Sequence, residues 1–175
     1  QITTTISKIE HANPLNAYGK KCFSQSDEDG ITIEIFKRLK NLNSGSFLEL
    51  GVGDGTENNT LILLSLGWKG FWVSGSNLAF DTSSSKKLKF YKNWITIENI
   101  LSVINKGLKH LKVKELDLIS VDLDGNDFYI VEKILHSGFS PKVFILEYNA
   151  KFPPPVKFKI NYNPKHKWKN DDYFG

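Results

Sequence analysis

Apolar residues recur along this chain at two spacings, and the spacing changes from one segment to the next. Short apolar runs that end in glycine or polar turns are typical of buried strands, and the sequence predicts five of them, at 46–51, 70–74, 94–98, 116–123 and 143–148. Apolar residues at helical spacing, with acidic residues in the first turn or glycine after the end, predict helices at 24–39, 58–66, 101–111 and 127–136. A Ser- and Lys-rich stretch at 81–91 predicts one further short helix.

The alternation of these elements predicts the fold class. Strands alternate with helices five times, an order that favours an α/β fold with a mostly parallel sheet and helices on both faces. Right-handed connections make the sheet doubly wound, and we expect the strand order 3-2-1-4-5. We divide the chain into an N-terminal arm (1–22), a Rossmann-like domain (23–152) and a Pro- and aromatic-rich extension of the same domain (153–175). In such sheets ligands bind beyond the carboxyl ends of the strands.

The first predicted strand runs into a turn with three alternate glycines. Gly51, Gly53 and Gly55 follow directly after Glu49 and Leu50. Glycine lets the backbone adopt positive φ and lets a ligand approach the main chain closely. The spacing G-x-G-x-G differs from the G-x-G-x-x-G of dinucleotide-binding folds. The turn predicts a ligand site at the end of this strand; the alternative is a tight turn without a ligand, in which Glu49 caps the next helix.

Carboxylates gather where the fourth and fifth predicted strands end. Asp122, Asp124, Asn126 and Asp127 follow the fourth strand, and Glu147 lies at the end of the fifth. Like charges at this range raise one another's pKa or require a cation, so the pattern predicts a general base or a Mg²⁺ or Ca²⁺ site. Our candidate catalytic residues are Asp122, Asp124 and Glu147, and our candidate metal ligands are Asp122, Asp124 and Asn126. The alternative is structural: Asp127 caps the following helix, and Asp124 lies in a turn.

Composition narrows the classes of function. The chain has 175 residues, a net charge of +4 and 40% apolar residues, which is ordinary for one globular domain. Arg38 is the only arginine, which argues against sequence-specific nucleic-acid binding. No apolar run approaches the roughly 20 residues that span a bilayer, and the single cysteine, Cys22, indicates a reducing, cytoplasmic location. The chain begins with Gln1 and contains no methionine, so we expect it to be part of a longer protein.

Several blocks together resemble the FkbM-type family of S-adenosylmethionine-dependent methyltransferases, which are class I, Rossmann-like enzymes. The blocks lie at 23–30, 47–60, 67–70, 119–127, 145–150 and 168–175. The resemblance implies S-adenosylmethionine as the cofactor, with Mg²⁺ as a candidate second one. It also implies O-methylation of a small hydroxylated substrate, such as a carbohydrate. Members of the family continue into further strands, so the resemblance also implies that this chain lacks the last strands of its sheet.

The resemblance implies a set of residues that contact the cofactor. Gln25 and Asp29 would face its site, Glu49 would lie beside the methionine amino group, and Glu98 and Asn99 would lie near the adenine. The full set is Gln25, Asp29, Glu49, Gly51, Gly53, Gly55, Thr56, Asn59, Ser74, Glu98 and Asn99. Ser74 departs from the usual pattern, because an aspartate or glutamate at this strand end normally takes both ribose hydroxyls.

Two alternative functions are open at this point. Asp122-x-Asp124 has the D-x-D form of metal-dependent glycosyltransferases that bind a nucleotide-sugar. A degenerate methyltransferase fold that serves as a binding module is the other alternative, and the serine at position 74 favours it. The chain carries no P-loop, zinc-ligand or serine-hydrolase motif, and none of its four histidines falls at a predicted strand end.

Overall fold

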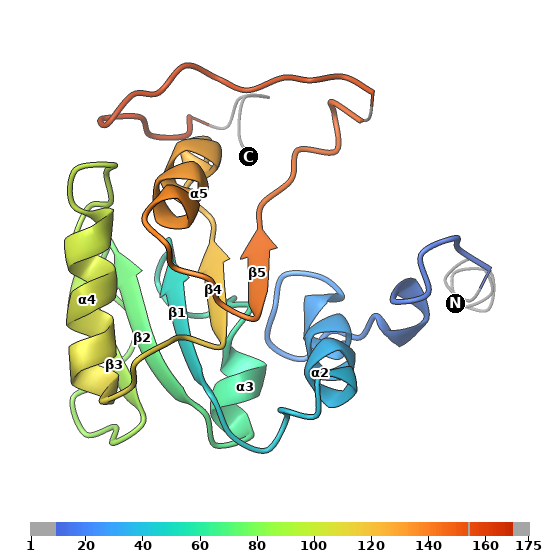
Figure 1. The fold of residues 1–175 in the computed structure, drawn as a ribbon, viewed down its shortest axis with the longest axis horizontal. Helices are drawn as coiled ribbons and strands as arrows, with labels where there is room; N and C mark the ends of the chain where they lie inside the picture. Colours follow the sequence, from blue (N-terminus) through green and yellow to red (C-terminus); the bar gives the residue numbers. More distant parts are fainter. Residues whose placement is uncertain (1–9, 154, 170–175) are drawn as a thin grey trace.

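The computed structural model describes residues 10–153 and 155–169. Within that part, five strands form one sheet in the order β3-β2-β1-β4-β5, and all neighbouring strands are parallel (Figure 1). The strands are β1 (Ser46–Leu50), β2 (Lys69–Ser74), β3 (Leu88–Lys92), β4 (Leu118–Val121) and β5 (Val143–Leu146). The expected α/β class, parallel sheet and strand order are confirmed, and the arrangement is Rossmann-like.

Helices cover both faces of the sheet. They are α2 (Glu28–Arg38), α3 (Leu61–Ser65), α4 (Ile100–Leu111) and α5 (Asp127–His136), preceded by the 3₁₀-helix η1 (Asn16–Tyr18). Alternate β1 residues point to opposite faces: Leu48 and Leu50 join the apolar core under α4 and α5, whereas Phe47 joins the core under α2 and α3. Every residue of β1 is buried, as expected for the central strand of a covered parallel sheet.

The third strand lies earlier in the chain than the sequence predicted. We expected a helix at 81–91 and a strand at 94–98; instead β3 occupies Leu88–Lys92, and residues 93–98 form a loop before α4. Both expectations were wrong. The register gives the reason: Leu88 pairs with Gly70 and Lys92 with Ser74, the last residue of β2. The chain beyond Lys92 has therefore passed the end of β2 and has no strand to pair with.

The C-terminal segment crosses the carboxyl-end edge of the sheet, above α5 (Figure 1). We call residues 157–167 the C-terminal strap. The Tyr129 hydroxyl donates to the Ile160 carbonyl (2.8 Å), and the Trp94 indole N–H donates to the Pro164 carbonyl (2.6 Å). The strap thus joins the loop after β3 to α5, two parts of the domain that are far apart in the sequence. The expected family block at 168–175 lies largely outside the described residues.

The described part of the N-terminal arm also packs on the domain. The Gly30 amide donates to the Lys20 carbonyl (3.0 Å), and the Arg38 guanidinium lies 5.3 Å from the ring centre of Tyr18. These contacts fix the loop between η1 and α2, which reaches the site described next.

Candidate functional site

The carboxyl ends of the strands form the floor of a cleft with two adjoining chambers. The larger chamber, of about 700 Å³, is lined by residues from segments 25–28, 49–59, 122–124 and 145–148. The smaller chamber, of about 140 Å³, is lined by residues from 51–53, 74–76, 93–95 and 122–126. Gly51, Gly53, Asp122 and Asp124 line both chambers. The glycine turn therefore stands between the chambers, at the switch in strand order where ligands bind to such sheets, and the larger chamber has the size of a small-molecule site.

The three glycines of the turn all have positive φ, but they have different surroundings. A Cβ atom on Gly51 (φ +85°) would lie 1.6 Å from the Asp122 carbonyl oxygen, so β1 and β4 can approach only if this side chain is absent. A Cβ on Gly53 (φ +54°) would meet nothing within 4 Å, because the residue borders the open cleft. Gly55 (φ +86°) packs instead against Leu78, and it lines neither chamber.

Glu49 fixes the segment that follows the turn. Its buried carboxylate accepts a hydrogen bond from the Asn59 amide (2.9 Å) and a second one from the Thr60 hydroxyl. The Trp72 indole N–H in turn donates to the Thr60 hydroxyl oxygen (2.9 Å). Burial raises the pKa of Glu49 to about 7, and the hydrogen bonds from Thr60 and Asn59 oppose that rise. Glu49, Thr56 and Asn59 all line the larger chamber or its rim. Glu49 thus holds the α3 entry in place while it borders the ligand space.

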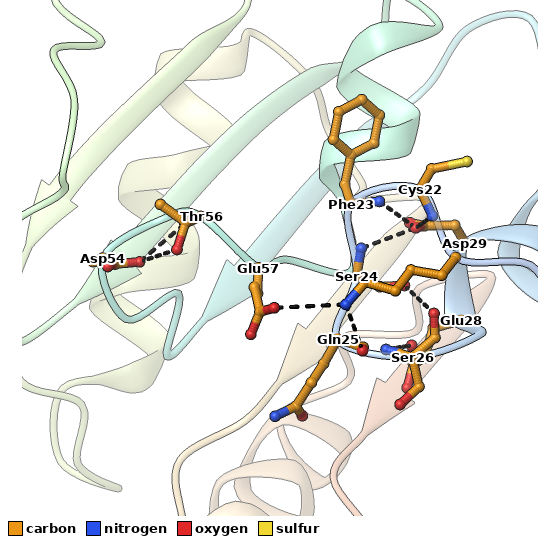
Figure 2. A network of polar contacts seen from close by, with 11 residues as sticks. Cys22, Phe23, Ser24, Gln25, Ser26, Glu28, Asp29, Asp54, Thr56 and Glu57 are labelled. Carbon is orange, nitrogen blue, oxygen red and sulfur yellow. Dashed lines mark hydrogen bonds and ion pairs between the residues drawn. The ribbon is translucent and has the colours of Figure 1, made fainter.

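One buried carboxylate organises the loop that carries Gln25 (Figure 2). A single oxygen of Asp29, Oδ2, accepts hydrogen bonds from the backbone amides of Cys22, Phe23 and Ser24 at 2.6, 2.6 and 2.9 Å. Asp29 is fully buried and lines neither chamber, whereas Gln25 lines the larger one. Asp29 is therefore placed to shape the loop, and Gln25 is placed to meet a ligand.

The rim of the larger chamber is polar, and Figure 2 labels Asp54, Thr56 and Glu57 on it. The Lys21 ammonium donates to the Gln25 carbonyl (2.9 Å) and lies 3.6 Å from the Glu57 carboxylate. The Thr56 hydroxyl and amide both donate to Asp54, at 2.6 and 3.0 Å, which lowers the pKa of Asp54. The ion pair between Lys21 and Glu57 ties the loop before α2 to the segment after the glycine turn.

Asp122, Asp124 and Glu147 meet at the cleft floor, and we call them the acidic group. One carboxylate oxygen from each lies within 4.8 Å of the other two. Burial, together with the smaller effect of the neighbouring carboxylates, raises the pKa of Asp122 to about 6 and that of Glu147 to about 8. Although the Asp122 side chain can be reached from the cleft, the surrounding protein desolvates it. Three such oxygens can share a proton or hold a divalent cation, for which carboxylates are suitable ligands.

Two neighbours of the acidic group have structural partners. Asp127 is buried and accepts hydrogen bonds from the amides of Leu123 (2.9 Å) and Gly125 (3.0 Å), so it shapes the turn before α5. The side-chain amide of Asn126 donates to the Asn163 carbonyl (2.9 Å) and accepts from the Asn163 amide (3.3 Å). Asn126, a candidate metal ligand, is thus engaged with the C-terminal strap.

The smaller chamber is built partly from residues that the sequence did not indicate. Ser74 lines it, and its hydroxyl accepts a hydrogen bond from the Ser76 amide (3.1 Å). Asn93 and Trp94, which follow β3, line it as well. We missed both because we placed the third strand too late; the alternation of apolar and lysine residues in 88–92 was the available signal.

Glu98 and Asn99 lie away from both chambers, at the start of α4. The Asn99 side chain accepts from the Thr96 amide (3.0 Å) and donates to the Trp94 carbonyl (2.7 Å), so it shapes the loop behind the smaller chamber. The Tyr162 hydroxyl donates to Glu98 (3.4 Å). Because β3 ends at Lys92, Glu98 and Asn99 follow a loop and do not lie at a strand end.

The C-terminal strap brings His166 to the acidic group. Its charge lowers the pKa of Asp124, against the larger effect of burial. The His166 Nε2 atom is buried and has no hydrogen-bond partner among the described residues. No periodic pattern in the aromatic- and Lys-rich tail pointed to this position, so sequence reasoning missed it.

Comparisons with known proteins do not assign this chain to a family. No protein-family model matches the chain, and no curated protein matches it. Among the described residues, no helix has both the length and the apolar character that crossing a membrane requires.

Proposed function

We propose that this protein is an S-adenosylmethionine-dependent methyltransferase, similar to the FkbM-type family, that methylates a hydroxyl group of a small substrate. The observation that carries the proposal is the glycine turn at the switch point, with one chamber on each side and the acidic group on its β4 flank. A cofactor that lies across Gly51 and Gly53 would occupy both chambers, and its reactive centre would face the side of the larger chamber where Asp122 lies.

The residues present are suited to such a cofactor. Gln25 and Glu49 of the larger chamber would receive the methionine end, where Glu49 offers an acceptor to an ammonium group. Ser74, Asn93 and Trp94 of the smaller chamber would receive the nucleoside end, with the indole of Trp94 as a stacking surface. The ribose would be held by single hydroxyl and amide groups, because Ser74 replaces the usual acid.

The methyl group would move in one step from the sulfonium to the substrate oxygen, which also loses a proton. Asp122 is the proposed base, because it lies between the chambers and its pKa of about 6 leaves it mostly ionised at neutral pH. Glu147, with a pKa of about 8, would stay mostly protonated and donate a hydrogen bond. The carboxylates of the acidic group would be the ligands of a Mg²⁺ ion, and the ion would orient the substrate oxygen.

Titration calorimetry with S-adenosylhomocysteine tests the cofactor assignment. We expect saturable binding, and we expect Gly53→Ala to weaken it at least about tenfold, because a methyl group on the turn would occupy space that the cofactor needs. Gly138→Ala is the matched control, because Gly138 also has positive φ and open surroundings but lies after α5, outside both chambers. Absence of heat and of a thermal shift at millimolar ligand would refute the proposal.

The acidic group supports a second candidate, a metal-dependent glycosyltransferase. Asp122-x-Asp124 together with Glu147 offers three oxygens to one ion, as a D-x-D site requires. Binding of a nucleotide-sugar that depends on Mn²⁺, without binding of S-adenosylhomocysteine, would favour this candidate.

A further inference from the structure

The larger chamber is lined by more acidic side chains than methyl transfer requires. Seven carboxylates line it: the three of the acidic group and those of Glu28, Glu49, Asp54 and Glu57. No lysine, arginine or histidine among the described residues lines it. The whole chain has a net charge of +4, so the chamber is a local acidic region in a basic protein.

Some of these carboxylates already have a hydrogen-bond or ion-pair partner within the protein, whereas other polar groups of the chamber indicate that a ligand binds there. Glu28 accepts from the Ser26 amide (2.9 Å), and Glu57 lies near Lys21 at the rim. By contrast, the buried Glu147 Oε2 atom has no hydrogen-bond partner among the described residues. Asn58, only 3% exposed, lines the same chamber, and its Oδ1 atom has no partner in this part of the chain either. The Asn58 oxygen beside the cavity requires a hydrogen-bond donor, which a ligand that fills the cavity can supply.

We infer that the methyl acceptor is a hydroxylated amine, and that its ammonium group binds in the larger chamber between the acidic group and Asn58. This acceptor class rests on the proposed function, since an acceptor exists only if methyl transfer does. An ammonium group supplies a positive charge and three donors. A phosphate or carboxylate would bring like charge against the ionised carboxylates of the chamber, and a neutral sugar would supply donors without charge.

Three probes with one sugar skeleton test the charge preference: glucosamine, glucose and glucose 6-phosphate. Their binding to ¹⁵N-labelled protein, treated with EDTA, is followed by the shifts of the Gly51 and Gly53 amide resonances. We expect glucosamine to bind at least about tenfold more tightly than glucose 6-phosphate, with glucose between them. Equal affinities, or tighter binding of the phosphate, would overturn the inference.

A charge-neutralising variant links the preference to the acidic group. Asp124→Asn removes one carboxylate, and asparagine tolerates the positive φ of this position (+55°), so the fold should persist. We expect the preference for glucosamine over glucose to fall roughly fivefold, as expected for the loss of one nearby charge in solvated surroundings. Glu132→Gln, on the exposed side of α5 outside both chambers, is the control and should leave the preference unchanged.

Three further outcomes are decisive. If Mg²⁺ added to the EDTA-treated protein reverses the order of the probes, the cation that the chamber takes is the metal, and the amine assignment is overturned. If S-adenosylhomocysteine binds but glucosamine shows no preference, the amine assignment fails while the proposed function stands. If glucosamine binds selectively and S-adenosylhomocysteine does not bind, the proposed function fails and the charge preference of the chamber remains.

Discussion

Gly51→Ala should destabilise the fold far more than the same change two residues later. The new Cβ would lie 1.6 Å from the Asp122 carbonyl oxygen, so the ends of β1 and β4 must separate by more than 1 Å. That movement would break the hydrogen bond from the Asp122 amide to the Leu50 carbonyl (3.0 Å), worth about 0.5–1.5 kcal/mol. Positive φ costs alanine about 1–3 kcal/mol, and overpacking adds about 1–3 kcal/mol. The total is about 2.5–7.5 kcal/mol, a large part of the about 5–15 kcal/mol that stabilises a typical domain.

Gly53→Ala isolates the backbone contribution, because its Cβ would meet no atom within 4 Å. We expect it to cost only the about 1–3 kcal/mol of positive φ. Urea unfolding followed by circular dichroism measures both variants. At a slope of about 2 kcal/mol per molar urea, an excess loss of about 2 kcal/mol moves the midpoint by about 1 M. Equal midpoints for the two variants would refute the reasoning, since they would mean that the Asp122 carbonyl does not limit the space at Gly51.

Three further predictions follow from the contacts of single residues. Asp122→Asn should lower turnover by roughly 10²–10⁴-fold, while the affinity for S-adenosylhomocysteine stays unchanged. It should also remove the increase of kcat/KM that is expected as the pH rises through about 6. Full activity of the variant would exclude Asp122 as the base. Burial holds the folded-state pKa of Glu49 at about 7, above its ordinary 4.5, so the folded state binds the extra proton and stability falls as pH rises between these values. Glu49→Gln should remove about 3 kcal/mol of that fall, as measured by urea unfolding at both ends of the window, and an unchanged pH dependence would contradict this cause. Asn126→Ala should speed hydrogen exchange in the C-terminal strap, because both hydrogen bonds to Asn163 are lost. Asn161→Ala, at an exposed position of the same strap, is the control and should leave the exchange rates unchanged. Equal effects of the two variants would show that the Asn126–Asn163 hydrogen bonds do not hold the strap.

The parts of the fold with strong periodicity could be predicted from the sequence. The helix at 127–136 begins and ends where it was expected, and the glycine turn falls at the switch point, because apolar spacing and glycine both act locally. The third strand could not be placed in this way. Trp94, Ile95 and Ile97 alternate like a strand, but the length of β2 decides which residues can pair, and that length is a property of the neighbouring strand.

The candidate site could be predicted only where it is formed by strand ends. Asp122 and Glu147 meet because adjacent parallel strands end at one edge of the sheet. Asn58 and His166 could not be predicted. Asn58 lies in the loop before α3, where its burial depends on the packing of the folded domain and not on the local pattern of apolar residues. His166 comes from a strap that is held by individual hydrogen bonds to distant residues, and such contacts leave no pattern in the local sequence.

The position of β1 between its two neighbours also sets the order in which the cleft can form during folding. Leu48 pairs with Phe71, 23 residues later, and with Ile119, 71 residues later. Closing the longer loop costs about 1 kcal/mol more chain entropy, so we expect β1 to pair with β2 before it pairs with β4. The side of the cleft that carries Ser74 would then form before the side that carries Asp122. Pulse-labelling hydrogen exchange should protect the Phe71 amide before the Asp122 amide, which donates to the Leu50 carbonyl of β1 (3.0 Å); the reverse order would contradict this. A folding intermediate in which β1 has paired with β2 but not with β4 would contain only the part of the ligand site near Ser74. A ligand that contacts both the Ser74 side and the Asp122 side of the cleft would therefore affect the last step of folding.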